Sequence, residues 1–190
     1  MAGIATAPDH RHTFVREKPG MIHAPDAAPG SLSAPGLGWV AAHGGAGVTT
    51  LSIVLGGRDL GARWPDAARA EPARIMLVAR THAQGLRAAS RGLNALREGR
   101  HPAGMQLVGL VLVADAPGPL PPPLVTRIRL LRSIVPVWRV PWIAPWRLGK
   151  QVPGLPKQAV GLGRIVQLCE AGGRRQAVPA GSASKKPATP

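Results

Sequence analysis

The stretch that decides the fold of this chain is His43-Gly44-Gly45-Ala46-Gly47-Val48-Thr49-Thr50. It separates a β-rich apolar run at 39–42 from a helix-forming apolar run at 51–55. Glycines between a strand and a helix let the backbone N–H groups curl around phosphate oxygens at the helix N-terminus. The stretch therefore predicts a phosphate-binding loop whose cofactor-binding residues are Gly44, Gly45, Ala46, Gly47, Val48, Thr49 and Thr50.

The predicted loop lacks its main electrostatic group. Val48 stands where such loops carry a lysine, and valine offers neither charge nor hydrogen-bond donor. Thr49 supplies the hydroxyl that would hold magnesium if a magnesium nucleotide binds, and no catalytic residue is predicted. We therefore do not expect a competent NTPase. A glycine-rich turn also forms for backbone reasons alone, so a purely structural turn is the alternative.

Segments on either side of the loop indicate an α/β fold. Apolar, β-rich runs predict strands at 39–43, 74–80, 107–114 and 134–140. Helical patterns predict one helix that starts at 49, a second at 83–97, a third that begins in the proline run 121–123 and ends near 132, and a fourth at 157–171. Residues 56–66 are interpreted as a loop. This alternation predicts a small parallel sheet of about four strands with crossover helices.

Composition divides the 190 residues into three parts. Residues 1–36 predict a disordered arm rich in Pro, Ala and Gly, 37–172 a minimal α/β domain, and 173–190 a disordered basic tail. No apolar run approaches the roughly 20 residues of a membrane span, and the N-terminus has no apolar signal core, so a cytoplasmic location is expected. The single cysteine, Cys169, has no partner for a disulfide, and no Cys/His spacing indicates zinc.

The charge balance indicates an anionic partner. The chain has 24 Lys and Arg against 9 Asp and Glu, a formal net charge of +15. Candidate anion-binding residues on the predicted helices are Arg87, Arg91, Arg129 and Arg132. A solvated helix face is the alternative for these arginines. A protein partner is expected, and nucleic acid is a second option.

The order of these features resembles the MinD/ParA family of deviant P-loop ATPases. In that family the loop reads lysine, two glycines, any residue, glycine, lysine and two threonines. Six positions match here, Gly44, Gly45, Ala46, Gly47, Thr49 and Thr50, while His43 and Val48 stand at the two lysine positions. The segments 74–89, 108–112 and 134–149 resemble later family strands and the region that flanks the nucleotide base. Only about eighteen residues, 56–73, stand where the family has two further strands, a magnesium-linked aspartate and a switch.

This resemblance implies a shortened, degenerate, non-hydrolysing relative. ATP is the cofactor that it implies, bound weakly, and the implied role is a nucleotide-sensing or partner-binding component of a bacterial DNA-transfer, partition or secretion system. Dimerisation is left open because His43 replaces the lysine that would reach across the dimer interface in the family. The alternative function is a basic nucleic-acid accessory protein that uses the fold as a scaffold.

Several side chains could complete the site. Arg58, Arg63 or Arg147 could supply a cation to the loop, because a guanidinium binds phosphate bidentately. Asp59 or Asp115 could hold a metal, although single aspartates in such places usually form caps and turns. Trp138, Trp142 and Trp146 are expected to pack under the sheet edge or to line the base pocket, with a membrane-surface or nucleic-acid patch as the alternative.

Overall fold

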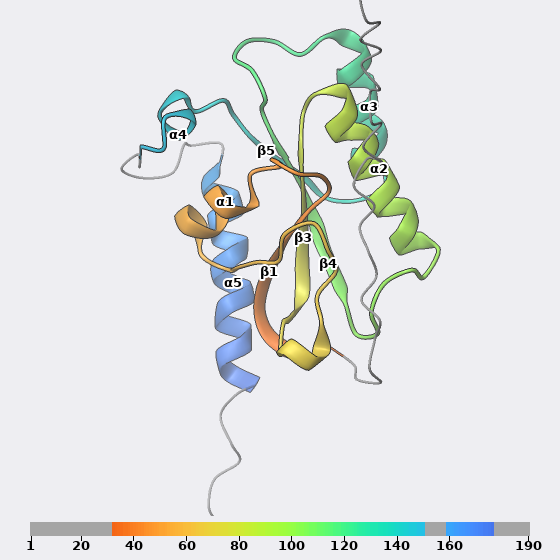
Figure 1. The fold of residues 1–190 in the computed structure, drawn as a ribbon, viewed down its shortest axis with the longest axis vertical. Coiled ribbons are helices and arrows are strands. Elements are labelled where there is room, and N and C mark those ends of the chain that lie inside the picture. The colour runs from red at the N-terminus through yellow and green to blue at the C-terminus, as the bar shows by residue number, and fades with distance from the viewer. Residues whose placement is uncertain (1–31, 151–158, 177–190) are drawn as a thin grey trace, which may run out of the picture.

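The computed structural model describes residues 32–150 and 159–176. Its centre is a five-stranded sheet in the order β2-β1-β3-β4-β5, in which every neighbouring pair is parallel (Figure 1). The strands are β1 (Ala34–Ala41), β2 (Arg58–Asp59), β3 (Pro72–Arg80), β4 (Gln106–Val113) and β5 (Val137–Val140). The helices are α1 (Val48–Leu55), α2 (Ala83–Arg97), α3 (Pro122–Arg132), α4 (Ala144–Arg147) and α5 (Val160–Gln176), with a 3₁₀ turn at Ala67–Arg69. The predicted α/β class is thus confirmed.

Helices cover both faces of the sheet (Figure 1). On one face, Ile75, Leu77 and Ala79 of β3 belong to a core that includes buried residues of α2 and α3. On the other face, Met76 and Val78 belong to a second core that includes buried residues of α1 and α5. Burial on both faces explains why the central strands are nearly continuous apolar runs rather than alternating ones.

The strand order reverses direction between β1 and β3, which makes this position the topological switch point of the sheet. From β1 the chain passes through α1 to β2 on one side, and from β3 it passes through α2 to β4 on the other. The helices of the two crossovers lie on opposite faces. In open α/β sheets, ligands bind in the crevice beyond the carboxyl ends of the strands at such a point. This crevice lies between β1 and β3, where the glycine loop begins.

The bounds of the central strands β3 and β4 agree with the sequence patterns within two residues, and those of α2 and α3 agree as closely, whereas the first and last strands and α5 differ more. Helix α2 has the predicted bounds, and α3 begins within the predicted proline run and ends at Arg132. The first strand runs from Ala34 to Ala41, and the last is shortened to 137–140 because Ser133 follows α3 in a turn. The prediction of an unstructured loop at 56–66 was wrong for Arg58–Asp59, which pair with Gly38 and Trp39 as a fifth strand.

The terminal predictions are only partly within the described residues. Strand β1 starts inside the predicted N-terminal arm, and α5 extends to Gln176, past the predicted boundary at 172. The remainder of both predicted disordered tails, and the expected helix start at 157, lie outside the described residues. None of the helices in residues 32–150 and 159–176 has the length and apolar character needed to cross a membrane.

Candidate functional site

The glycine loop forms an exposed concavity at the start of α1. Gly45 and Gly47 have φ values of 74° and 104°, in the left-handed region that favours glycine, and Gly47 is the N-cap of the helix. A Cβ added to Gly44 or Gly45 would meet nothing within 4 Å. Left-handed residues interspersed in a turn direct successive N–H groups into one anion-binding concavity. The backbone conformation therefore suits the predicted phosphate contacts.

The first-turn amides of α1 are available to a ligand. A helix leaves its first N–H groups without intrahelical acceptors. Among the described residues, no hydrogen bond involves the N–H groups of Gly47, Val48, Thr49 and Thr50, whereas Leu51 donates to the Gly47 carbonyl at 3.0 Å. These four amides and the exposed Gly44 and Gly45 are therefore the predicted loop residues whose backbone could contact a ligand.

Two of the predicted site residues contribute no side chain to the loop surface. Val48 and Ala46 are 7% and 1% exposed and belong to the core on the α1 side of the sheet. Valine at the lysine position thus packs the helix onto the sheet. Only the backbone N–H of Val48 remains for binding.

Arg80 brings a cation to the loop from the end of β3. Its Nε donates to the Gly45 carbonyl at 3.1 Å, and its Nη1 donates to the Ala114 carbonyl at 2.9 Å. Its Nη2 lies 3.9 Å from the position that a Cβ on Gly47 would occupy. A guanidinium therefore lies against the loop that lacks its lysine. The sequence alone does not point to Arg80, although this residue ends a predicted strand, because its proximity to the loop depends on β3 pairing with β1.

Neither Arg58 nor Arg63, two of the arginines suggested by the sequence, fills this role in the described contacts. Arg63 donates to both carboxylate oxygens of Glu71 at 2.6 Å, and Arg58 lies 3.7 Å from the same carboxylate. Both are therefore engaged beside the 3₁₀ turn. The side chain of Arg147 is outside the described part of the structure.

His43, at the family's signature lysine position, holds the loop to β3. Its Nε2 accepts the Arg80 backbone N–H at 3.1 Å, and its Nδ1 lies 2.8 Å from the Gly44 carbonyl oxygen. This pattern assigns the neutral tautomer with a proton on Nδ1. Burial lowers the pKa of His43 below 6.5, and the charges of His82, Arg80 and Arg91 lower it further. His43 is therefore a neutral structural contact rather than a substitute cation.

Thr49 and Asp59 come together at the other side of the loop. The Thr49 hydroxyl donates to Asp59 Oδ2 at 2.6 Å, and Asp59 Oδ1 accepts the Gly61 N–H at 2.8 Å. Strand β2 makes this contact by placing Asp59 beside β1. A hydroxyl and a carboxylate are hard oxygen ligands that suit magnesium. The described residues contain no cluster of three or more His, Cys, Asp or Glu, so most ligands of such a cation would be water or phosphate.

Asp115, the other candidate metal ligand, is committed to a different contact. Its Oδ1 accepts the hydroxyl of buried Thr81 at 2.5 Å, and its N–H donates to the same hydroxyl at 3.2 Å. This reciprocal pair joins the ends of β3 and β4. Asp115 therefore has the bonding pattern of a turn former, which was the alternative considered from the sequence.

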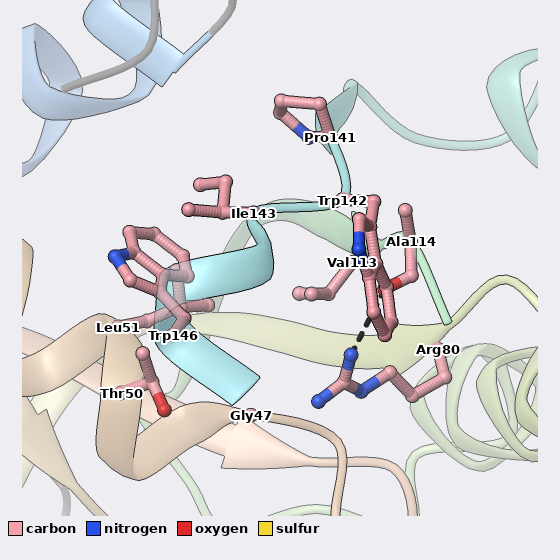
Figure 2. Close-up of a pocket in the computed structure, with 10 residues that line it drawn as sticks. All are labelled: Gly47, Thr50, Leu51, Arg80, Val113, Ala114, Pro141, Trp142, Ile143 and Trp146. Carbon is pink, nitrogen blue, oxygen red and sulfur yellow. Dashed lines mark hydrogen bonds between the residues drawn. The ribbon is translucent and has the colours of Figure 1, made fainter. Parts of the chain in front are cut away.

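A cavity of about 180 Å³ lies beside the loop at the carboxyl edge of the sheet. Figure 2 shows its lining, with Trp142 and Trp146 on opposite sides and the Arg80 side chain near Trp142. The lining residues are Gly47, Thr50, Leu51, Arg80, Val113, Ala114, Pro141, Trp142, Ile143 and Trp146. Arg80 is thus the one charged residue in this lining, and most of the other lining residues are apolar or aromatic.

The three tryptophans divide between packing on the sheet and lining the cavity. Trp142 and Trp146 line the cavity, whereas Trp138 packs over Gly109, where an added Cβ would lie 2.2 Å from the indole. The three indoles therefore do not form a single exposed patch.

The four arginines predicted as anion-binding residues do not line this cavity. Arg87 and Arg91 are exposed on α2, and Arg129 and Arg132 are exposed on α3. Their helices pack on the sheet face opposite α1. Any anion that these residues bind would contact a surface other than the cavity.

Comparison with known proteins identifies a family for this chain. No curated protein and no solved structure matches it significantly. A protein family described only as a family of unknown function, DUF6668, matches residues 36–162, which include the glycine loop, Arg80 and the cavity-lining tryptophans. Because this match covers more than half of the sequence, the chain belongs to the DUF6668 family.

Proposed function

We propose that the protein binds a nucleoside triphosphate or a closely similar phosphorylated ligand at residues 44–50 and acts as a non-hydrolysing sensor. The observation that carries this proposal is the Arg80 guanidinium, which lies against a glycine loop with unpaired helix N-terminal amides. Backbone amides and an arginine together supply the donors and the positive charge that phosphate binding requires.

The same contacts argue against efficient hydrolysis. Arg80 is held by the Gly45 and Ala114 carbonyls, and the lysine position is a buried valine. Losing a charged group that faces the transferred phosphate costs about 3 kcal/mol or more of transition-state stabilisation. Binding without turnover is the function that this donor set supports best.

The size of the cavity limits which part of a ligand it encloses. At about 180 Å³ it is smaller than the roughly 300–1,000 Å³ of pockets that bury whole small ligands. A nucleotide would therefore lie partly over the exposed Gly44 and Gly45. Thr49 and Asp59 would hold its magnesium ion.

The resemblance to the MinD/ParA family extends the proposal to a cellular role. In this view the nucleotide-bound form engages a protein partner in a bacterial DNA-transfer, partition or secretion system. The supporting features are the loop and the order of the segments that follow it.

Calorimetry with magnesium and ATP, ADP or GTP tests nucleotide binding directly. We expect micromolar affinity for the natural chain, and at least about tenfold weaker binding for Arg80→Met, a loss of about 1.4 kcal/mol. Arg129→Met is the matched control, because it removes the same charge from a residue outside the cavity lining. Circular dichroism and thermal melting establish that each variant is folded. Absence of binding at millimolar nucleotide, or equal affinity of Arg80→Met and Arg129→Met, would overturn the proposal.

A phosphate-release assay tests the absence of turnover separately. We expect release at the background rate. Release above background that disappears in Thr49→Ala would show that the protein is an NTPase and that the non-hydrolysing part of the proposal is wrong.

A further inference from the structure

A second, larger hollow of about 610 Å³ lies between α2 and α3, on the sheet face opposite α1. Its apolar lining comes from both helices, from the start of β4 and from the segment that leads into β5. The apolar members are Leu93, Leu96, Leu107, Leu130, Leu131, Ile134, Val135 and Pro136. Its polar members are Ser90, Asn94, Arg97 and Arg127. The loop-side cavity shares none of these residues.

Large apolar side chains in this hollow are exposed to solvent. Leu130 is 62% exposed and Ile134 is 69% exposed, although both are of a size usually buried. Contiguous exposed apolar surface with a polar rim is typical of a protein interaction site. The hollow therefore has the character of a docking groove.

The charged side chains that line the groove, Arg97 and Arg127, are both basic. Helices α2 and α3 carry six exposed arginines and no acidic residue. No salt bridge recorded among residues 32–150 and 159–176 involves any of the six. Arg127 donates to the Ser90 hydroxyl at 3.2 Å, and Arg97 lies two turns further along α2. Two cations therefore border the apolar floor, because Arg127 contacts α2 at Ser90, and Ser90 and Arg97 are about 10 Å apart along the axis of α2.

We propose that this groove docks an acidic amphipathic helix of a protein partner. An apolar stripe would pack on Leu130 and Ile134, and acidic residues about two turns apart would pair with Arg97 and Arg127. Helix-in-groove recognition of this kind reads apolar anchors at i, i+3 or i+4, and i+7. The charge rim would orient the helix and select against basic segments.

The sequence favours an external partner over the chain's own terminal segments. Residues 177–190 contain two lysines and no acidic residue, and residues 1–31 contain three acidic residues against three Lys and Arg. Neither segment supplies the excess of negative charge that complements the arginines. A second copy of a chain with net charge +15 is also disfavoured.

Fluorescence anisotropy with a labelled synthetic peptide tests this surface on the full chain. The probe is a helix-forming peptide with leucines at i, i+3, i+4 and i+7 and glutamates on both flanks of the leucine stripe. A peptide with lysines replacing the glutamates and a scrambled peptide serve as ligand controls. We expect the acidic peptide to bind at least tenfold more tightly than either control.

Paired surface variants locate the binding on the protein. Ile134→Ser and Arg127→Glu should each weaken binding of the acidic peptide at least tenfold. Leu168→Ser and Arg129→Glu are the matched controls, because Leu168 is equally exposed on α5 and Arg129 lies on α3 outside the groove lining. These substitutions are at exposed positions, so thermal melting should show little change in stability.

Other results would overturn the proposal and indicate another occupant. Equal effects of Arg127→Glu and Arg129→Glu, together with tighter binding of a DNA duplex than of the peptide, would indicate a nucleic-acid surface. Displacement of the probe by a synthetic peptide of residues 1–31 would assign the groove to the chain itself. A concentration-dependent dimer that Ile134→Ser abolishes would assign it to a second copy. No binding of the acidic peptide at millimolar concentration would contradict a helix-docking groove.

Discussion

At the scale of single residues, His43 couples the glycine loop to pH. Its Nε2 accepts the Arg80 N–H, and its pKa lies below 6.5 chiefly because of burial. The folded state therefore favours the neutral ring, and the unfolded state takes up the proton first as pH falls. The resulting stability is fully present above pH 6.5 and is lost as pH falls from 6.5 toward the folded-state pKa.

Thermal melts between pH 7.5 and 5.0 measure this effect. We expect His43→Asn to cost about 1 kcal/mol at pH 7.5 through lost hydrogen bonds, and to flatten the fall in stability below pH 6.5. His101→Asn, a control at a histidine near the start of β4, should keep the natural slope. An unchanged slope in His43→Asn would contradict the assignment of a neutral, buried His43.

Glu71 makes a second prediction at this scale, because it is a carboxylate only 1% exposed. It accepts two hydrogen bonds from Arg63 at 2.6 Å and one from the Asp66 N–H at 2.8 Å. Glu71→Ala removes the carboxylate partner of half-buried Arg63, which keeps its bond to the Trp64 carbonyl, and should lower the free energy of unfolding in urea by about 2 kcal/mol. Glu98→Ala removes the exposed pair with Arg100 and should cost less than about 1 kcal/mol. Similar losses in both variants would contradict a stabilising role for the buried Glu71 carboxylate.

The Glu71 contacts also predict a loss of folding stability in acid, at a lower pH than the loss attributed to His43. Hydrogen bonding from Arg63 is the largest of the causes that lower the pKa of Glu71 below 4.5. Its stabilisation is present above pH 4.5 and is lost as pH falls through the folded-state pKa. Urea unfolding of the natural chain below pH 4.5 should show this loss, and Glu71→Ala should lack it.

At the scale of elements, helix α2 approaches the loop closely through Gly85. A Cβ there would lie 2.3 Å from the Arg80 carbonyl oxygen and 3.0 Å from His43 Nε2. We expect Gly85→Ala to push α2 away from the end of β3 and to lower the free energy of unfolding by about 1–3 kcal/mol. Gly161→Ala is the helical control, since its Cβ would meet nothing within 4 Å, and helix propensity should make it neutral or stabilising by up to about 1 kcal/mol. Equal stability of the two variants would show that α2 does not constrain the loop.

Some of these helices and strands can be predicted from the sequence and others cannot. Helix α2 follows from its apolar period and α3 from the prolines at its start, because these signals are local. Strand β2 has only two residues, exposed ones, so it carries no period, and it is defined by pairing with β1. A related reason explains why the sequence does not indicate Arg80. The glycine loop, its position at a helix N-terminus and Thr49 lie within one short stretch of sequence, whereas Arg80 lies beside them only because β3 pairs with β1.

At the scale of the whole molecule, one face of the sheet depends on α5, which lies largely beyond the family match at 36–162. Leu162, Val166 and Cys169 of α5 are buried in the core that also holds the α1 side of β1 and β3. Glu170 Oε1 also accepts the Leu37 N–H at 3.2 Å. Burying a large apolar side chain contributes about 1.5–3 kcal/mol, and a domain's net stability is only about 5–15 kcal/mol. Removal of α5 should therefore abolish most of the free energy of unfolding.

Two truncations measure this dependence. A chain ending at Lys150 should expose the α5-facing core, bind the dye ANS and unfold without a cooperative urea transition, whereas a chain ending at Gln176 should unfold like the natural one. The comparison isolates the segment 151–176, because both truncated chains keep every strand and helices α1 to α4. A cooperative transition at an unchanged urea midpoint in the shorter chain would mean that the α2–α3 side alone sustains the sheet. In that case α5 would be an appended helix, and the matched family segment would fold without it.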